Sequence, residues 1–223
     1  ILAHSIFNNG RVLTPLKELL FPVHCFGCKQ LGIEICSQCR RYWNPHFYIQ
    51  KIDGLSIYSS IRYSSVAKSI LLSAKEDSIK IADELIISAL TNCIKRLPTQ
   101  VLRSCILMPI PGSKRAIRKR GRDFIYELTK EVSLRTGLPC ISGMEVTRTL
   151  LDQSGLSAID RRRNIAGAFK ASIQSTEQDL ILVDDLVTTG ATLLEAKRAL
   201  FTNGITVSRA ITACVAQAPT IRG

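Results

Sequence analysis

The chain is poor in aromatic residues and in long apolar runs, and both shortages exclude classes of protein. Phe, Trp and Tyr make up 6% of its 223 residues, few for a surface that stacks nucleic-acid bases. No apolar run approaches the ~18–20 residues that cross a bilayer, so we expect no transmembrane segment. No apolar stretch followed by a small-residue cleavage site marks a secretory signal. We therefore expect a cytoplasmic protein.

Acidic residues are scarce relative to basic ones. The chain has 30 Lys and Arg against 18 Asp and Glu, which gives a formal net charge of +12. Residues 111–170 carry +7 of it, so we expect an anion site to involve this segment. The balance of 46% hydrophobic and 22% charged residues excludes disorder as the main state. The length allows one α/β domain with a small additional module.

Four of the eight cysteines form a C-x2-C-x7-C-x2-C pattern, made of Cys25, Cys28, Cys36 and Cys39. Two such knuckles can close four thiolates tetrahedrally around Zn²⁺. Redox pairs or disulfides are the alternative, but reduced cytosolic thiols favour a metal. Four thiolates leave no open coordination position, which predicts a structural site with His24 and His46 as bystanders. The remaining cysteines stand singly in apolar contexts and are interpreted as core residues: Cys93, Cys105, Cys140 and Cys214.

Hydrophobic periodicity divides the rest of the chain into helices and strands. Helical spacing covers residues 1–20, 65–73, 78–97, 123–136 and 190–201, and residues 55–63, 105–110, 138–146, 180–183 and 205–214 have strand character. Residues 147–168 are polar and Arg-rich with little periodicity, and the basic run 114–122 fits a solvated loop or a nucleic-acid patch. The alternation of strands and helices predicts an α/β fold with a mostly parallel sheet.

The most informative segment is the strand Leu180–Val183 with the residues that follow it. Asp184 and Asp185 stand at its carboxyl end, and a Thr-Thr-Gly-Ala-Thr loop (188–192) opens the next helix. Free N–H groups at a helix N-terminus, a glycine and threonine hydroxyls suit a phosphate. The carboxylates repel phosphate but can accept hydrogen bonds from ribose hydroxyls. The segment therefore predicts recognition of a ribose 5-phosphate at the strand ends.

This segment resembles the 5-phosphoribosyl-1-pyrophosphate (PRPP) signature of type I phosphoribosyltransferases. Three further features make the chain similar to the ComF family. They are the four-cysteine module, the strand end Met108-Pro109-Ile110-Pro111 with Arg120-Gly121, and a loop with Arg148-Thr149, Gln153, Leu156, Arg162 or Arg163, Asn164, Ala168 and Phe169. The chain departs from the family at Arg122-Asp123-Phe124, where Phe-Asn-Gln is usual.

The resemblance implies a type I phosphoribosyltransferase fold with a small N-terminal zinc-binding module. The module covers residues 1–50, and the transferase domain covers 51–223, with a hood-like part over 51–100 and the PRPP-binding core over 101–223. The implied PRPP-binding residues are Asp184, Asp185, Val187, Thr188, Thr189, Gly190, Ala191 and Thr192. Pyrophosphate is expected at Pro111, Gly112, Ser113, Lys114 and Arg120.

The implied reaction transfers phosphoribosyl from PRPP to a nitrogen acceptor with release of pyrophosphate. Asp184 and Asp185 are expected to hold the ribose hydroxyls and Mg²⁺-linked waters. Arg148 and Arg162 are expected to act catalytically in a loop that closes as a lid. Mg²⁺ would come with PRPP, while Zn²⁺ would be structural. Lys75 is interpreted as a surface lysine between two helices.

A second hypothesis is a PRPP sensor or single-stranded-DNA-binding protein without catalysis. The resemblance implies a role in natural competence and DNA uptake, with competence-machinery proteins as partners. The +7 segment suits phosphate backbones. The aromatic residues Tyr42, Trp43, Phe47 and Tyr48 could stack bases or pack under the zinc module, and a docking role for that module is the third alternative. The sequence reveals neither the acceptor nor the oligomeric state.

Overall fold

A computed structural model describes residues 23–148, 158–174, 176 and 178–216. The helix predicted over residues 1–20 lies outside this part. A five-stranded sheet forms the centre of the fold, in the order β1-β2-β7-β6-β3. Its strands are β1 (Tyr48–Ile52), β2 (Leu55–Arg62), β3 (Cys105–Pro109), β6 (Asp179–Val187) and β7 (Arg209–Val215).

Four of the five strands run parallel, and β1 pairs antiparallel with β2 at the edge. A separate antiparallel pair joins β4 (Met144–Val146) to β5 (Phe169–Ala171). The predicted α/β class with a parallel open sheet flanked by helices is therefore confirmed. The carboxyl ends of β3 and β6 lie side by side because Pro109 pairs with Val183.

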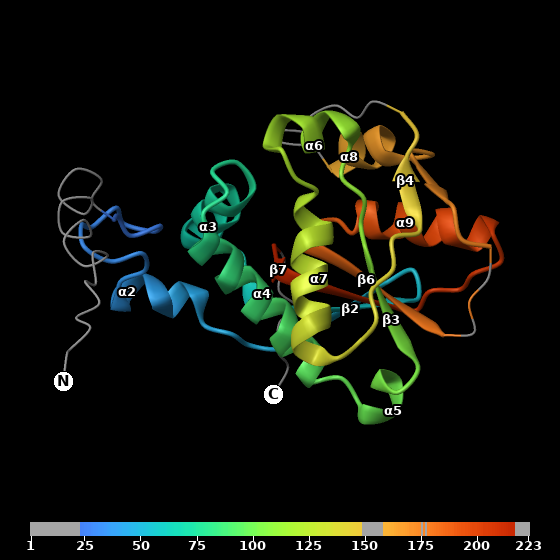
Figure 1. The fold of residues 1–223 in the computed structure, drawn as a ribbon, viewed down its shortest axis with the longest axis horizontal. Helices are drawn as coiled ribbons and strands as arrows, with labels where there is room; N and C mark the ends of the chain where they lie inside the picture. Colours follow the sequence, from blue (N-terminus) through green and yellow to red (C-terminus); the bar gives the residue numbers. More distant parts are fainter. Residues whose placement is uncertain (1–22, 149–157, 175, 177, 217–223) are drawn as a thin grey trace, which may run out of the picture.

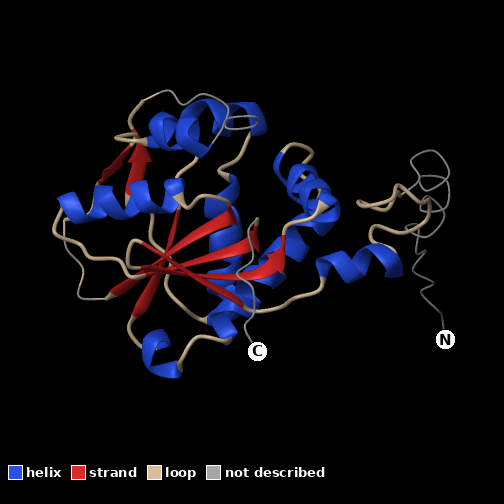
Figure 2. Cartoon of the chain, turned by 180° about the vertical axis from the view of Figure 1, so that it is seen from behind, coloured by secondary structure: helices blue, strands red, loops and turns tan. Residues whose placement is uncertain are grey.

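Helices cover both faces of the sheet (Figure 1). The helices α4 (Lys80–Lys95) and α7 (Phe124–Thr136) pack on one face. The opposite face carries α9 (Ala191–Thr202), which contacts β5 and α8 (Ala158–Ile165), and Figure 2 shows the sheet from behind. The other helices are α2 (Ser37–Arg40), the 3₁₀ turn η1 (Arg41–Trp43), α3 (Ser65–Lys75), α5 (Thr99–Leu102) and α6 (Lys114–Arg120).

Local signals set several of these boundaries. The Ser64 side chain accepts a hydrogen bond from the Ala67 N–H at 3.1 Å and caps the start of α3. Helix α7 ends at Gly137, whose φ of +73° suits the left-handed C-terminal cap. The strand β6 is buried from Leu180 to Asp185, as expected for a central strand of a covered parallel sheet.

Several elements differ from the sequence expectations. The basic run 114–122 contains helix α6, and the segment 147–168 contains α8. Both are short polar helices without an apolar stripe, so periodicity could not reveal them. Strand β4 is shorter than predicted, while β6 is longer and includes both aspartates. Strand β1 runs from Tyr48 to Ile52 and so crosses the boundary that was expected between residues 50 and 51. The division into two domains stays a prediction.

The four-cysteine module packs into the main core. Cys25, Cys36 and Cys39 share one buried cluster with Val66 and Ile70 of α3. The module therefore packs against α3 and helps to hold it in place. Among the described residues, no helix is long and apolar enough to cross a bilayer.

A buried pair of hydroxyl groups lies in the sheet, in register with Asp184. The Ser59 and Thr212 hydroxyl oxygens are 2.7 Å apart, and Thr212 donates to the Cys214 carbonyl at 3.0 Å. Ser59 therefore donates to Thr212. Thr212 pairs across the ladder with both Ser59 and Asp184.

We expect Thr212→Val to destabilise the protein by about 1–3 kcal/mol, because the Ser59 hydroxyl loses its acceptor while buried. Urea unfolding of the single variant and of Ser59→Ala/Thr212→Val measures the effect. The double variant should recover part of the loss, since both partners are then apolar. A double variant less stable than Thr212→Val alone would contradict this reading.

Candidate functional site

A small polar pocket lies at the carboxyl end of β6, where the chain turns into α9. It is lined by Asp184, Leu186, Val187, Thr188, Thr189, Gly190, Ala191, Thr192 and Leu193. All the predicted PRPP-binding residues line it except Asp185. The first N–H groups of α9 point toward this turn, as at any helix N-terminus. The pocket therefore combines hydroxyl and backbone donors with one carboxyl group.

Gly190 is required at this turn. Its φ is +75°, and a Cβ atom there would lie 2.8 Å from Cδ1 of Ile52 on β1. A larger residue would be strained by both the backbone conformation and the contact. Glycine therefore allows the N-terminus of α9 to lie close to β1 while it lines the pocket.

The carboxyl groups of the two aspartates of β6 interact directly with each other. The Asp185 N–H also donates to Oδ1 of Asp184 at 2.9 Å. Only 9% of Asp184 and 5% of Asp185 is exposed. Of the two, Asp184 lines the pocket.

Asp185 has a cationic partner that the sequence analysis missed. The Lys75 ammonium lies 2.7 Å from Oδ2 of Asp185. Lys75 is the last residue of α3, and its Nζ lies 5.6 Å from the centre of the Phe124 ring. A lysine between two helices has no sequence signature that places it across the fold at a strand end. Its side chain is only 27% exposed, so it is not the surface lysine that was expected.

The charges of Lys75, Asp184 and Asp185 shift one another's pKa values. Burial, followed by the charge of Asp185, raises the pKa of Asp184 well above its usual range. Burial also opposes ionisation of Asp185, but Lys75 outweighs it and holds the pKa of Asp185 below its usual value. Burial likewise opposes the charge on Lys75, and Asp185 and Asp184 reverse the effect and raise its pKa. Asp184 therefore keeps a proton to higher pH than Asp185 does.

The ion pair stabilises the fold over a defined pH window. Because the pKa of Asp185 is lowered, its contribution is present above its unfolded pKa of ~3.9 and is lost as pH falls through the folded value. Because the pKa of Lys75 is raised, its contribution is present below its unfolded pKa of ~10.4 and is lost as pH rises through the folded value. Neutral pH lies inside this window.

The predicted pyrophosphate-binding residues follow β3, beside the end of β6. Pro111, Gly112 and Ser113 connect β3 to α6, and the Ser113 hydroxyl caps α6 by accepting from the Ala116 N–H at 3.2 Å. Lys114 is exposed. Arg120 pairs with Glu76 at 2.8 Å, so a carboxylate already contacts its guanidinium.

The predicted catalytic arginines lie near α8. The Arg148 guanidinium donates to the carbonyl groups of Asn164 at 2.7 Å and Ala166 at 2.9 Å. It thereby caps the carboxyl end of α8. Arg162 is exposed on α8. The intervening residues 149–157, which belong to the predicted lid, lie outside the described residues.

The four cysteines of the N-terminal module converge. Their sulfur atoms all lie within 4.8 Å of one another, and those of Cys28 and Cys36 are 3.7 Å apart. This arrangement is compatible with zinc binding, as four sulfur donors are the ligand set of closed structural zinc sites. Neither His24 nor His46 belongs to the cluster. A Cβ atom at Gly27 would lie 2.5 Å from the Cys39 sulfur, so glycine permits the convergence.

The thiols of this cluster differ in acidity. Burial disfavours the Cys25 thiolate, but backbone N–H groups led by that of Cys36 lower its pKa to about 6. Burial and hydrogen bonds with the other three thiols raise the pKa of Cys39 to about 12. Four thiolates this close repel one another strongly, and a divalent cation removes that cost. The donor set therefore fits Zn²⁺.

Mg²⁺ has no comparable site. Among the residues that the structure describes, the cysteines form the one group of three or more His, Cys, Asp or Glu side chains able to hold a metal. Asp184 and Asp185 supply only two carboxyl groups, and Lys75 neutralises Asp185. A magnesium ion would therefore have to bring most of its oxygen ligands with the substrate.

Fold and site together define an α/β protein with a four-cysteine module and a small pocket where the strand β6 turns into the helix α9. No protein-family model matches the chain. It is similar to the DNA utilization protein YhgH of Escherichia coli O157:H7, with 41% identity over 58 residues, 26% of each chain. It is also similar to Competence protein F of Haemophilus influenzae, with 30% identity over 103 residues, 44% of this chain and 45% of that protein. These relatives confirm the resemblance to the ComF family. The chain matches less than half the length of each.

Solved structures similar to this chain include several phosphoribosyltransferases. The orotate phosphoribosyltransferase from Aeropyrum pernix aligns with 79% of this chain and 78% of its own, at 12% identity and a TM-score of 0.39. An adenine phosphoribosyltransferase from Trypanosoma brucei aligns with 87% of this chain and 89% of its own, at 10% identity and a TM-score of 0.39.

We expect one Zn²⁺ per chain, and we expect Cys39→Ser to lose it. The fold should then lose at least ~2 kcal/mol of stability, because metal binding contributes to folding at such sites and the module packs on α3. Elemental analysis and thermal unfolding with and without a chelator measure both effects. Cys140→Ser, which changes a half-buried cysteine outside the cluster, is the matched control. Full zinc content in Cys39→Ser would contradict the assignment.

Proposed function

We propose that the protein binds PRPP and transfers its phosphoribosyl group to an acceptor with release of pyrophosphate. The observation that carries the proposal is the pocket at the end of β6, where Asp184 and the loop from Thr188 to Thr192 line one polar cavity. Thr188, Thr189 and Thr192 offer hydroxyl donors to the 5′-phosphate, with N–H groups of the first turn of α9. Asp184 lines the same pocket and would accept a hydrogen bond from a ribose hydroxyl.

The chemistry needs a held ribose and a stabilised leaving group more than a strong base. The acceptor nitrogen attacks ribose C1, the C1–O bond breaks, and pyrophosphate leaves with the electron pair. A proton leaves the acceptor nitrogen when the C1–N bond has formed. Asp184 and Asp185 orient the ribose hydroxyls, and the N–H groups and side chains of Pro111–Lys114 with Arg120 contact pyrophosphate. Mg²⁺ brought with PRPP would supply further charge neutralisation.

Arg148 and Arg162 have different parts in this proposal. Arg148 fixes the end of α8 through the carbonyl groups of Asn164 and Ala166. Arg162 is exposed on the same helix, so it can contact the leaving pyrophosphate when the loop closes.

Single-stranded DNA is the second candidate ligand, and the names of the relatives, a competence protein and a DNA utilization protein, favour it. Basic residues are exposed at one end of the molecule, on α6 and α8 (Figure 1): Lys114, Arg115, Arg118, Lys119, Arg162 and Arg163. A phosphate backbone could bind there without entering the pocket. A role in DNA uptake, with competence proteins as partners, is compatible with either ligand.

We expect Asp184→Asn/Asp185→Asn to weaken PRPP binding by on the order of a hundredfold, since both carboxyl groups lose acceptor strength toward the ribose. Calorimetry with PRPP and Mg²⁺ measures binding, and pyrophosphate release with a panel of bases and amines measures transfer. Glu145→Gln, an exposed carboxylate on β4, is the control. Unchanged PRPP affinity in the double variant would refute the assigned site. Salt-dependent binding of single-stranded DNA that survives in this variant would support the second candidate.

A further inference from the structure

The end of helix α3 is held by three neighbouring elements through three consecutive residues. The Ala74 carbonyl accepts from Arg122 at 2.8 Å, and Lys75 pairs with Asp185 at 2.7 Å. Glu76 pairs with Lys119 at 2.7 Å and with Arg120 at 2.8 Å. A helix end so anchored cannot shift without breaking charged contacts. The position of the Lys75 ammonium is therefore set by groups outside its own helix.

Arg122 makes the most contacts around this helix end. Its guanidinium donates to both carboxylate oxygens of Asp83 at 2.7 Å, in a pair that is 12% and 10% exposed. It also lies over the Phe124 ring, 5.1 Å from its centre. Lys75 lies 5.6 Å from the same ring centre. Phe124 thus contacts two cations, one held by Asp83 and the other held by Asp185.

These contacts involve the segment Arg122-Asp123-Phe124, in which the sequence departs from the usual pattern of the ComF family. Arg122 and Phe124 occupy two of the three departing positions, and both contact the Lys75 region. An arginine can bind Asp83 with two bonds and Ala74 with a third because its guanidinium is a planar fork. A lysine at position 122 would keep the charge and lose this geometry.

We propose that Arg122 is a positioning residue for Lys75, and that Lys75 in turn orients Asp185 in the ribose site. The inference rests on the proposed function, because it assigns Asp185 to a ribose hydroxyl. Lys75 already supplies the positive charge that the Asp185 carboxylate requires. Asp185 is therefore prepared for a neutral hydroxyl and disfavours a bare divalent cation.

The charged and titratable groups around the Lys75–Asp185 pair come from several elements. Asp184 of β6 and Arg120 at the end of α6 act on Lys75, while Lys75 and Asp184 act on Asp185. Cys214 of β7 lies within the field of Asp185, and Cys93 of α4 acts on Cys214. Burial raises the pKa of both thiols, which therefore stay neutral. Lys75 is thus the cation that most favours ionised Asp185.

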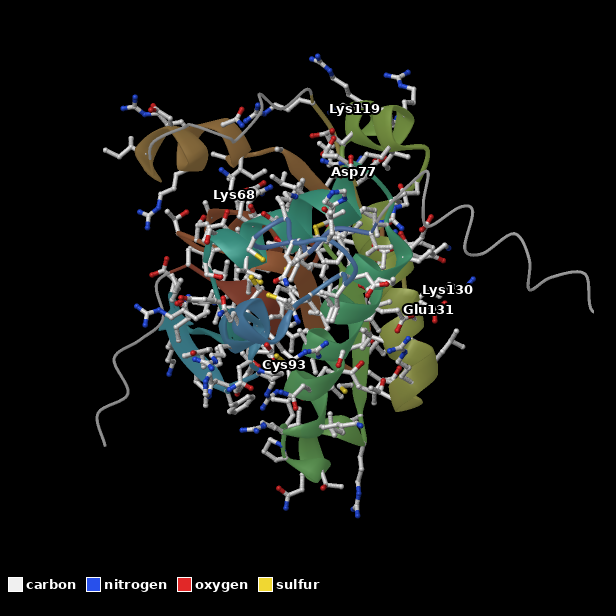
Figure 3. All side chains as sticks on the ribbon, turned by 90° about the vertical axis from the view of Figure 1, so that its left-hand side faces the viewer. Lys68, Asp77, Cys93, Lys119, Lys130 and Glu131 are labelled. Carbon is white, nitrogen blue, oxygen red and sulfur yellow. The ribbon has the colours of Figure 1, made fainter. Side chains whose placement is uncertain are left out.

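The first experiment follows the aspartate carboxyl carbons of the full-length chain by carbon-13 NMR during a pH titration, without ligand. The Asp185 signal is identified by its loss in Asp185→Asn. We expect Lys75→Met to raise the pKa of Asp185, because the ammonium that favours the carboxylate is gone. Arg122→Met should shift this pKa in the same direction and by less. Lys68→Met, on the exposed side of α3, and Lys130→Met, on α7, are the charge-matched controls (Figure 3).

The second experiment measures ribose 5-phosphate affinity by calorimetry between pH 6 and pH 8. We expect Lys75→Met to weaken binding about tenfold, which corresponds to one lost charge-assisted contact. In the Lys75→Met background, Arg122→Met should have no further effect on affinity, because it acts through Lys75. Arg122→Lys should resemble Arg122→Met. Additive losses, or Arg122→Lys behaving as wild type, would overturn the positioning role.

Removing Arg122 alone leaves Asp83 buried without a partner and could unfold the chain. Arg122→Met is therefore also tested together with Asp83→Asn, which removes that charge. Unchanged Asp185 titration in this folded double variant overturns the inference. A wild-type protein that binds neither PRPP nor ribose 5-phosphate refutes the proposed function and the ligand part of the inference. The titration of Asp185 then still decides whether Arg122 positions Lys75.

Discussion

The ion pair between Lys75 and Asp185 is the interaction on which the organisation of the site depends. It joins the carboxyl end of β6 to the end of α3 across a buried boundary. A buried carboxylate without a partner would be strongly unfavourable beside a second carboxyl group. Burial and the charge of Asp185 raise the pKa of Asp184, while Lys75 outweighs burial and lowers the pKa of Asp185. The two aspartates are adjacent in sequence but chemically unequal, because Lys75 pairs with Asp185 while Asp184 lines the pocket.

The four-cysteine module contributes to the same site through packing. Gly27 and Cys39 lie against Val66 in the first turn of α3, and the buried cysteines belong to the main core. Helix α3 then carries the contact to its other end, where Lys75 meets Asp185. A helix transmits position well because its backbone hydrogen bonds make it rigid. The four-cysteine module can therefore support a pocket that it does not touch.

The charged side chains are distributed unevenly over the molecule. Basic side chains gather on α6 and α8, while the pocket holds a carboxyl group and neutral donors. Part of the basic charge is paired internally, since Lys119 and Arg120 contact Glu76 and Arg122 contacts Asp83. The net charge of +12 thus overstates the positive charge available to a ligand. What remains exposed can attract phosphate groups, whether of a sugar phosphate or of a nucleic-acid backbone.

The sequence by itself determined the parallel α/β fold, the convergence of four cysteines and the strand-loop-helix in which Gly190 precedes α9. These features depend on short-range rules: alternation of buried strands with helices, knuckle spacing, and a glycine where φ is positive. Only the tertiary structure decided that Lys75 is the partner of Asp185, and that Arg122 holds Ala74 and Asp83. Those contacts join residues 39 to 110 positions apart, and no local pattern encodes such a pairing, because it arises only when separate elements pack together.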